Sequence, residues 1–574
     1  MAAQPPEVAQ RVSLKGMAVV TVVLLGKWAG DPTPGSYRRL RGASNAAGVL
    51  CWRPPRARSA PRRLRESCLI VLSLKERDPA VLRRAILSAP QKADALEVRL
   101  DGLDRPDPPM LSALFGGAPR PIIASCRRAS DGGGFRGSES RRRDLLWAAV
   151  KAGASYVDVE HGSGASSLAR EAAALSSLGV ILSHHDRSGM PRDPMRLYRA
   201  MARVPGVKAI KIVGTARRPS HILEARDLLE RARGKGPPLI AFCMGAAGAA
   251  SRVLALEWGS WATYAAAGPG RETAPGQVTL TDLIGVYRIE DIDDETRYAG
   301  IVGCPLGHTL SPVIHNAAYA ADGLNFRYLP FETPPSGLRD VARVARALKV
   351  RGLSVTAPYK IAAYRKVDLA EPLARRVGAV NTVLCDGRRL VGFNTDASGA
   401  LAPLLEALEE RGLRLEEMTV AIVGSGGAAR AVAHAAAPRA GSVIVSSRSE
   451  RPGRAIARAV AGRFVPLSRL AGSSYDVLVN CTPVGMNGAR EGRGPALPVP
   501  RRAVKGRLVY DVIYRPEATG LLREAKARGI PTLGGLEMLL RQAAEQHVLF
   551  TGRSAPLEAM REAARQALGG RQGG

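Results

Sequence analysis

Eight short apolar runs recur between residues 68 and 265, and helix-compatible stretches separate them. The runs are 68–74, 95–100, 121–126, 155–159, 179–183, 207–213, 238–243 and 261–265. Most are largely apolar on both faces, as expected for parallel strands covered by helices. Runs of this kind predict an α/β fold that begins with a (β/α)8 TIM barrel over residues 66–287.

Polar side chains stand at the ends of these apolar runs. They are Ser73, Glu97, Arg99, Arg127, Glu160, His185 and Lys211. In a parallel barrel the carboxyl ends of the strands carry the active site. The sequence therefore predicts a catalytic site built from these residues.

Lys211 lies in the run 207–213, which also contains Lys208. The two side chains point to opposite faces of a strand, so only one can line a barrel interior. A lysine in a desolvated pocket has its neutral amine favoured, which imine formation with a ketone requires. His185, at the end of the preceding run, suits a general base near neutral pH. An ordinary strand-end lysine is the alternative.

A second α/β region follows an acidic stretch at 289–296, which we interpret as a short linker. Strands are predicted at 297–302, 326–331, 352–355, 418–423 and 442–446, and an amphipathic helix at 400–411. Between the last two strands lies a glycine turn, Gly424-Ser-Gly-Gly-Ala-Ala-Arg430, followed by a helix through Ala436. The order strand, glycine turn, helix, strand is typical of dinucleotide binding.

A lysine–aspartate pair, Lys360 and Asp396, precedes the glycine turn and suits carbonyl reduction. Arg448 follows the next strand, where an NAD enzyme often has an acidic residue. An arginine at this place favours the 2′-phosphate of NADP, with an ordinary surface arginine as the alternative.

The chain of 574 residues has a formal net charge of +32, but its arginines are spread along the sequence and aromatic residues make up 5%. We therefore expect anionic substrates and no nucleic-acid partner. Seven scattered cysteines without a CxxC pair argue against a disulfide framework or a metal site. No apolar run approaches the roughly 20 residues of a membrane helix, so no membrane partner is expected.

Residues 1–65 are rich in Arg, Pro, Gly and Ala and poor in acidic residues. We expect a poorly ordered basic extension that carries no chemistry. A plastid or mitochondrial transit segment fits this composition, and so does a start codon placed too far upstream. The cysteine usage indicates a reducing compartment, so the expected location is cytoplasmic, with the plastid as the alternative.

Six motifs occur in order in the first half of the chain: 96–101 (LEVRLD), 125–127 (SCR), 183–186 (SHHD), 210–212 (IKI), 251–253 (SRV) and 273–277 (TAPGQ). On these motifs residues 68–287 resemble type I 3-dehydroquinate dehydratases. The resemblance implies that Lys211 forms a Schiff base with the substrate ketone and that His185 removes the adjacent proton and later helps water to leave. The residues implied to bind the substrate carboxylate and hydroxyls are Ser73, Glu97, Arg99, Arg127, Arg252, Thr273 and Gln277.

A second set of motifs covers 303–312 (GCPLGHTLSP), 353–360 (LSVTAPYK), 378–382 (GAVNT), 392–396 (GFNTD), 480–485 (NCTPVG) and 534–538 (GGLEM). On these motifs residues 297–569 resemble shikimate dehydrogenases. The resemblance implies a substrate-binding domain at 297–398, a Rossmann NADP-binding domain at 399–545, and at 546–574 a C-terminal helix that returns to the substrate domain, with a tail.

The same resemblance assigns roles in this second site. It places Lys360 and Asp396 against the reacting carbonyl, with Lys360 as the acid–base. The implied substrate ligands are Thr309, Ser311, Thr356, Asn381, Tyr514 and Gln542. The implied cofactor ligands are Gly424, Ser425, Gly426, Gly427, Ala428, Ser447, Arg448, Ser449, Val512 and Gly535.

The sequence departs from both family patterns at a few positions. Asp131 stands where the dehydratases usually have Glu, one methylene longer, and the loop after Met244 has no polar lid residues. Thr309 stands where shikimate enzymes commonly have Ser, and Ser447 and Ser449 flank Arg448 where Asn and Thr are usual. The first departures predict a slower first site, and Thr309 leaves a quinate-type side activity open.

Together these features predict a bifunctional shikimate-pathway enzyme. Its barrel would dehydrate 3-dehydroquinate, and its second half would reduce the resulting 3-dehydroshikimate to shikimate with NADPH. The alternatives are a quinate/shikimate dehydrogenase fusion and a catalytically silent quinate-pathway regulator, although the four catalytic side chains are all present. The expected partners are small-molecule substrates, and the expected state is a monomer or homodimer.

Overall fold

The structure is a computed structural model that describes residues 68–162, 167–169, 171, 178–307, 309–387, 389–486 and 496–569. The predicted basic extension at 1–65 therefore lies outside the described residues. Two compact units divide the chain between Tyr359 and Lys360. The domain limits at 66–287, 297–398, 399–545 and 546–574 stay predictions.

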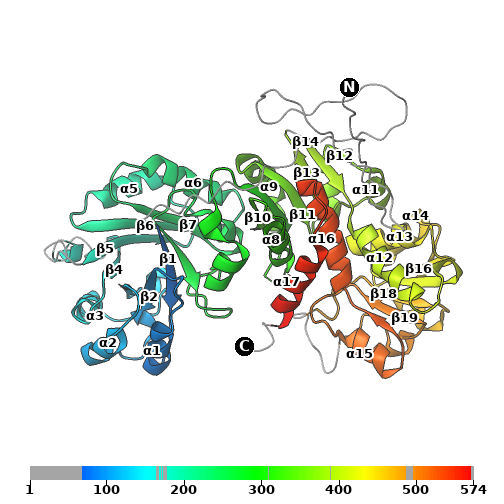
Figure 1. Ribbon diagram of the computed structural model, residues 1–574, viewed down its shortest axis with the longest axis horizontal. Helices are drawn as coiled ribbons and strands as arrows, with labels where there is room; N and C mark the ends of the chain where they lie inside the picture. The colour runs from blue at the N-terminus through cyan, green and yellow to red at the C-terminus, as the bar shows by residue number, and fades with distance from the viewer. Residues whose placement is uncertain are drawn as a thin grey trace, which may run out of the picture. The chain divides into compact units, whose positions relative to one another are not determined.

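Eight strands form the barrel of the first unit, in the order β7-β6-β5-β4-β3-β2-β1-β8 (Figure 1). All neighbouring strands in this order are parallel. Their bounds are β1 Leu69–Leu74, β2 Ala95–Arg99, β3 Ile122–Ser125, β4 Tyr156–Glu160, β5 Gly179–Asp186, β6 Val207–Thr215, β7 Leu239–Met244 and β8 Ala262–Ala266. Each predicted run overlaps one strand, so the predicted barrel is confirmed.

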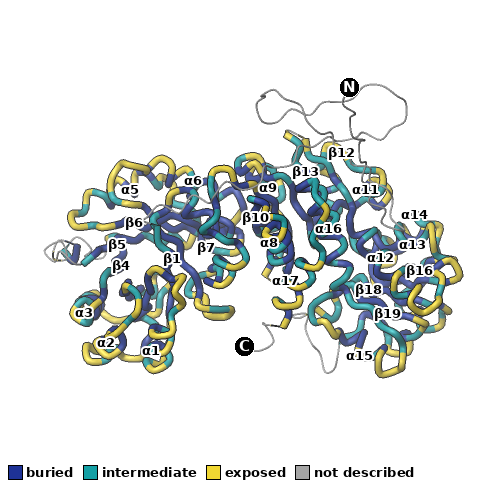
Figure 2. Tube along the Cα trace, viewed as in Figure 1, coloured by how far each residue is buried: buried dark blue, intermediate teal, exposed yellow. Residues whose placement is uncertain are grey.

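Helices cover the barrel strands: α1 Pro79–Leu87, α2 Pro108–Phe115, α3 Glu139–Lys151, α5 Pro194–Ala202, α6 His221–Ala232 and α7 Ala249–Leu254. Three of them begin with an aspartate followed by proline. Asp78, Asp107 and Asp193 each accept a hydrogen bond from a backbone N–H of the first turn. This pairing fixes the start of a helix because the aspartate satisfies a free N–H and proline has none to satisfy. Figure 2 shows the strands buried and the outer helix faces exposed.

The stretch that we interpreted as a linker is packed against the first unit. It forms a short 3-10 turn, Ile289–Asp291, in which Ile289 is 1% exposed, and Ile292 beyond it is 5% exposed. Glu290 pairs with Lys92 at 2.8 Å. The acidic residues suggested an exposed connection, but the two isoleucines between them anchor it by burying apolar surface.

Three further parallel strands complete the first unit: β9 Arg297–Gly303, β10 Phe326–Glu332 and β11 Val350–Val355. Their connections contain α8 Ser311–Ala321 and α9 Leu338–Ala347. All three strands overlap the strands predicted from the sequence.

The second unit opens with α10 Lys360–Tyr364, β12 Leu369–Ala370, α11 Pro372–Val377, β13 Thr382–Asp386, β14 Arg389–Phe393 and α12 Asp396–Glu409. The predicted start of α12 at residue 400 was wrong, because the helix begins at Asp396. Asn394 Oδ1 accepts a hydrogen bond from the backbone N–H of Ala397 at 3.2 Å and so caps the earlier turn. This start places the Asp396 carboxylate at the helix N-terminus, where the helix dipole stabilises negative charge.

The remaining sheet has the strand order β17-β16-β15-β18-β19-β20, with all neighbours parallel. Its strands are β15 Thr419–Val423, β16 Ser442–Ser447, β17 Arg463–Pro466, β18 Val477–Asn480, β19 Leu508–Asp511 and β20 Thr532–Leu533. The helices are α13 Gly427–Ala436, α14 Glu450–Ala459, α15 Gly520–Ala527, α16 Leu536–Thr551 and α17 Leu557–Gly569. This is the Rossmann order, in which ligands bind where the connections reverse direction, between β15 and β18. The predicted Rossmann fold is confirmed.

Candidate active sites

Lys211 lies inside the barrel on β6 and is 3% exposed, whereas Lys208 is exposed. The Lys211 Nζ lies 3.2 Å from Asp158 Oδ2 and 3.6 Å from Glu97 Oε1. It also stands 3.7 Å from the centroid of the Tyr264 ring. The amine is thus desolvated as predicted, but two carboxylates surround it in place of a purely apolar pocket.

Asp158 is the residue at the centre of the barrel site that the sequence reasoning missed. Burial alone would raise the pKa of this carboxyl, but Lys211, Arg127 and the Ser183 hydroxyl bring its pKa below the ordinary value. Ser183 Oγ donates to Asp158 Oδ1 at 2.5 Å. A signal existed in the run 155–159, because Asp158 is an acidic residue within an otherwise apolar parallel strand.

His185 is held by Arg127, whose guanidinium contacts the ring at Nδ1. Burial first, and then the charges of Arg127 and Lys211, hold the pKa of His185 well below its ordinary value. The ring is therefore neutral near pH 7 and able to accept a proton. Because a guanidinium can only donate, Nδ1 is the acceptor and the ring proton lies on Nε2.

Four of the predicted substrate ligands form one hydrogen-bonded chain. Ser73 Oγ donates to Glu97 Oε2 at 2.7 Å, and Gln277 Nε2 donates to Ser73 Oγ at 3.2 Å. Gln277 Oε1 in turn accepts from the Thr273 backbone N–H at 2.8 Å and from its hydroxyl at 3.2 Å. The chain joins the carboxyl end of β1 to the segment after β8 and fixes Glu97 beside Lys211.

The two other predicted arginines differ in their partners. Arg99 is paired at two points with Asp101, at 2.8 and 2.7 Å. Arg252 is 1% exposed and stacks on the Phe242 ring at 4.5 Å, while its Nε has no hydrogen-bond partner. Burial lowers the pKa of Arg252 to about 10. A buried arginine that makes no ion pair with a carboxylate of the described residues fits the binding of an anionic ligand.

Asp131, which replaces the usual glutamate, is engaged by its own loop. Arg128 Nε donates to Asp131 Oδ2 at 2.6 Å. The shorter side chain thus anchors the turn Ala129–Asp131 after β3.

In the second unit Lys360 and Asp396 form a close pair. Lys360 Nζ donates to Asp396 Oδ2 at 2.6 Å, and Asn381 Nδ2 donates to Asp396 Oδ1 at 2.9 Å. Both carboxylate oxygens are therefore satisfied. The Lys360 side chain is 18% exposed and that of Asp396 is 6% exposed, so the lysine can meet a ligand while the aspartate holds it.

The glycine turn brings the dinucleotide segment against Lys360. Gly424 has φ +128°, a backbone conformation that favours glycine, and it follows β15 directly. A Cβ atom at Gly427 would lie 3.1 Å from Lys360 Cβ, so a larger residue would require Lys360 to shift by a few tenths of an ångström. Helix α13 begins here without a side-chain cap, which leaves its first N–H groups free to bind a phosphate. These features fit a dinucleotide.

The other predicted cofactor residues lie near this edge of the sheet. Ser425, Gly426 and Ala428 belong to the same turn, and exposed Arg448 follows β16, the neighbour of β15. The remaining four are Ser447, Ser449, Val512 and Gly535. Ser447 Oγ donates to the Ser449 carbonyl at 2.8 Å, and the Gly535 N–H donates to the carbonyl of the residue after Val512 at 3.2 Å.

The predicted ligands of the reductase substrate fall in both units. Thr309, Ser311 and Thr356 belong to the first, where Thr309 Oγ1 donates to Ser311 Oγ at 3.2 Å. Asn381, Tyr514 and Gln542 belong to the second. There Asn381 Nδ2 donates to Asp396 Oδ1 at 2.9 Å, and Gln542 Oε1 lies 3.4 Å from the same nitrogen.

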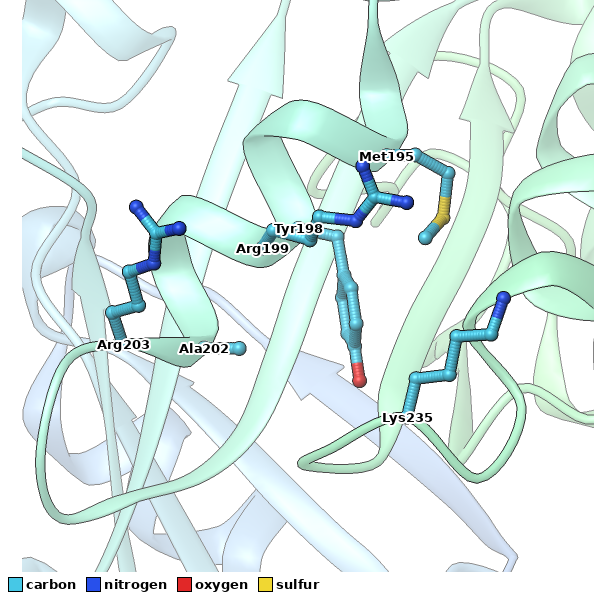
Figure 3. Close-up of a pocket in the computed structure, with 6 residues that line it drawn as sticks. All are labelled: Met195, Tyr198, Arg199, Ala202, Arg203 and Lys235. Carbon is cyan, nitrogen blue, oxygen red and sulfur yellow. The ribbon is translucent and has the colours of Figure 1, made fainter.

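A cavity of about 250 Å³ lies outside both sites (Figure 3). It is lined by Met195, Tyr198, Arg199, Ala202, Arg203 and Lys235. These residues precede β6 and β7, so the cavity is at the amino end of the barrel strands, opposite the catalytic side chains. Among the described residues, no group of His, Cys, Asp and Glu could hold a metal ion, and no helix is long and apolar enough to cross a membrane.

Comparisons with known proteins agree with this geometry. The family model of type I 3-dehydroquinase matches residues 70–294. The shikimate dehydrogenase substrate-binding domain matches 301–383, and the C-terminal domain of shikimate 5′-dehydrogenase matches 535–565.

Individual relatives cover either most of the chain or its second half. The chloroplastic bifunctional 3-dehydroquinate dehydratase/shikimate dehydrogenase of Arabidopsis thaliana is 32% identical over 485 residues, which cover 81% of this chain and 79% of the plant protein. Shikimate dehydrogenase (NADP(+)) of Symbiobacterium thermophilum is 39% identical over 48% of this chain and 95% of its own length. Shikimate 5-dehydrogenase of Thermus thermophilus, solved with NADP(H) and shikimate, is 38% identical over 48% of this chain and 100% of its own, with a TM-score of 0.42. This chain therefore belongs to the family of bifunctional 3-dehydroquinate dehydratase/shikimate dehydrogenases.

Proposed function

We propose that the two sites catalyse consecutive reactions. The barrel removes water from 3-dehydroquinate, and the second site reduces the product, 3-dehydroshikimate, to shikimate with NADPH. The observation that carries this proposal is the pairing of each predicted lysine with a buried carboxylate, Lys211 with Asp158 and Lys360 with Asp396. The product of the first reaction is the substrate of the second, and this is a rationale for joining the two sites in one chain.

In the barrel, Lys211 attacks the substrate ketone. The new C–N bond replaces the C=O bond, and the carbonyl oxygen leaves as water. The resulting iminium withdraws electrons from the adjacent carbon and makes its C–H bond acidic. His185 takes this proton at Nδ1, the ring nitrogen that Arg127 contacts in the structure and that carries no proton of its own. Protonated His185 then gives the proton to the departing hydroxyl, and water hydrolyses the imine.

The substrate carboxylate and hydroxyls are met by the other barrel side chains. Arg252 is the strongest candidate for the carboxylate because it is buried, makes no ion pair within 4 Å among the described residues, and has an Nε without a hydrogen-bond partner. Ser73, Glu97 and Gln277 present a preorganised chain to the ring hydroxyls. Arg99 and Thr273 complete this set at the mouth of the barrel.

In the reductase, Lys360 donates a proton to the carbonyl oxygen and Asp396 keeps the ammonium in place. NADPH supplies the hydride when it is bound. Gly424, Gly426 and Gly427 let the backbone approach the pyrophosphate, and Arg448 pairs with the 2′-phosphate. The ring hydroxyls and the carboxylate of the substrate are bound by Thr309, Ser311, Thr356, Asn381, Tyr514 and Gln542.

A coupled assay tests this function. Purified full-length chain with 3-dehydroquinate and NADPH is expected to oxidise NADPH and accumulate shikimate. Lys211→Ala should stop dehydration yet leave the reduction of supplied 3-dehydroshikimate near normal, and Asp396→Asn should do the reverse. If either change silenced both reactions, the two sites would not be separate. Turnover of quinate faster than shikimate in the reverse direction would favour a quinate enzyme.

We further propose that the chain is a monomer or homodimer that acts in the cytoplasm or, if residues 1–65 are a transit segment, in a plastid. The chloroplastic relative supports the second location. Light scattering of the purified chain and fluorescence imaging of the chain with and without residues 1–65 test these points.

A further inference from the structure

Helix α16 contributes more than Gln542 to the surroundings of Asp396. Gln546, one turn further along, is 1% exposed, and its Nε2 donates to Thr382 Oγ1 at 2.9 Å. Helix α16 packs along α12, the helix that begins with Asp396 (Figure 1). A buried amide at this place is therefore part of the polar layer beneath the catalytic pair.

The hydrogen bonds in this layer run in one direction. Thr382 Oγ1 accepts a hydrogen bond from Gln546 Nε2. The Thr382 hydroxyl in turn donates a hydrogen bond to Asn381 Oδ1 at 2.9 Å. The same oxygen also accepts from the backbone N–H of Thr395 at 2.8 Å. With Oδ1 facing two donors, the Asn381 amide nitrogen must face the other way, toward Asp396.

The end of this relay is the Asp396 carboxylate. Asn381 Nδ2 donates to Asp396 Oδ1 at 2.9 Å and to Thr395 Oγ1 at 2.9 Å. With Oδ1 occupied, Asp396 presents Oδ2 to Lys360. Asn381, Thr382, Thr395 and Asp396 are all at most 4% exposed, so water cannot easily replace a lost link.

We propose that Gln546 is a positioning residue for the reductase, which holds Asp396 in its catalytic orientation through Thr382 and Asn381. Gln546 touches neither substrate nor cofactor in this role. Without its N–H group, the Thr382 hydroxyl is no longer directed to Asn381 and can turn to Thr395 Oγ1, 3.4 Å away. Asn381 Oδ1 then keeps the Thr395 N–H as a donor but loses the Thr382 hydroxyl. The orientation of the Asn381 amide is less fixed, and its hydrogen bond to Asp396 Oδ1 weakens.

The proposal rests on the proposed acid–base role of the Lys360–Asp396 pair, and the wild-type chain tests that role first. Gln546→Met keeps the volume of the side chain but removes the donor. We expect kcat for reduction of 3-dehydroshikimate to fall about 5- to 30-fold, the effect of 1–2 kcal/mol. We expect the KM values to change little and the acid limb of kcat/KM to move to higher pH.

Two further variants establish that the effect passes along the relay. Thr382→Val removes the middle link, and the double variant should be no slower than the slower single variant, because both changes break one path. Gln546→Glu is nearly isosteric with the wild type. Once ionised, however, the new carboxylate can only accept a hydrogen bond from the Thr382 hydroxyl, so the direction of the relay is reversed. Its loss of activity should therefore grow as the pH rises.

The control is Gln566→Met, which changes an exposed glutamine of α17 and should leave both activities unaltered. Dehydration of 3-dehydroquinate by the same samples reports on folding. An unchanged kcat and pH profile in Gln546→Met would overturn the relay, as would additive losses in the double variant. A parallel fall in dehydration and reduction for both Gln546 variants would assign the residue to the fold and also overturn it. A wild-type chain that fails to reduce 3-dehydroshikimate would instead refute the proposed function.

Discussion

Arg252 is expected to destabilise the free protein while it enables substrate binding. Its guanidinium is buried on α7, and no carboxylate of the described residues pairs with it. Burial lowers its pKa to about 10, well below the ordinary value of an arginine, which corresponds to a cost of roughly 3 kcal/mol for the charged form. Stacking on Phe242 offsets part of this cost, by about 0.5–2 kcal/mol.

Replacing Arg252 by methionine should therefore stabilise the free chain. The cost of the charge, less the stacking energy, leaves a gain of about 1–2.5 kcal/mol, and each kcal/mol corresponds to roughly 2–4 °C in Tm. The penalty is fully present below pH 10 and disappears only as pH rises from about 10 toward 12.5, so measurements at pH 7.5 record all of it. Dehydratase KM should rise about 100-fold or more, since the variant loses charge-assisted hydrogen bonds to the substrate carboxylate.

Thermal and urea unfolding, with and without 3-dehydroshikimate, check both parts of this prediction. The product is also the proposed ligand of the reductase site, so it should stabilise the wild type through both sites and Arg252→Met less, through the reductase site alone. Arg231→Met is the matched control, because Arg231 is exposed on α6 and its loss should change stability by about 0.5 kcal/mol or less. A variant less stable than the wild type, or equal stabilisation of both by the product, would refute the reasoning.

Three other predictions follow from single side chains. Because burial and neighbouring charges hold the pKa of His185 well below its ordinary value, dehydratase kcat/KM should stay nearly constant from pH 8 to pH 6.5, and an acid limb within that range would contradict the assignment. Borohydride added with 3-dehydroquinate should trap an adduct that peptide mapping places on Lys211, and label on Lys208 would overturn the assignment of the inward face. Arg448→Ala should raise the KM for NADPH about 10- to 150-fold and leave NADH nearly unchanged, whereas equal weakening of both cofactors would point to another contact.

Much of the fold could be predicted from the sequence because the relevant signals are local. Apolar runs define barrel strands wherever both faces of a strand are buried, as at 238–243, which is observed as Leu239–Met244. The glycine turn after Val423 likewise marks the start of α13, since its backbone conformation favours glycine. Alternation along one strand also explains why Lys211 is buried and Lys208 exposed.

The parts that could not be predicted depend on contacts between distant segments. Asp158 lies beside Lys211 through pairing across β5, and no spacing rule relates these positions. One contact that the sequence analysis missed is local: Arg99 donates two hydrogen bonds to Asp101, which is only two positions away in the chain. The direction of the relay from Gln546 to Asp396 depends on which atom of each amide donates, and this follows only from the three-dimensional partners.

Both sites use a lysine beside a buried carboxylate, and the surroundings of the pair separate their proposed roles. Lys211 is 3% exposed and has Asp158, Glu97 and a neutral imidazole nearby, so a ketone that reaches its amine meets several hydrogen-bonding groups and little bulk water. Lys360 is more exposed and has one carboxylate, which stands at the N-terminus of α12 and is stabilised there as an anion. That arrangement fixes one side of the Lys360 amine and leaves the rest of it accessible to a ligand. We infer that the groups around each lysine, more than the lysine itself, decide between attack on a carbonyl and its protonation.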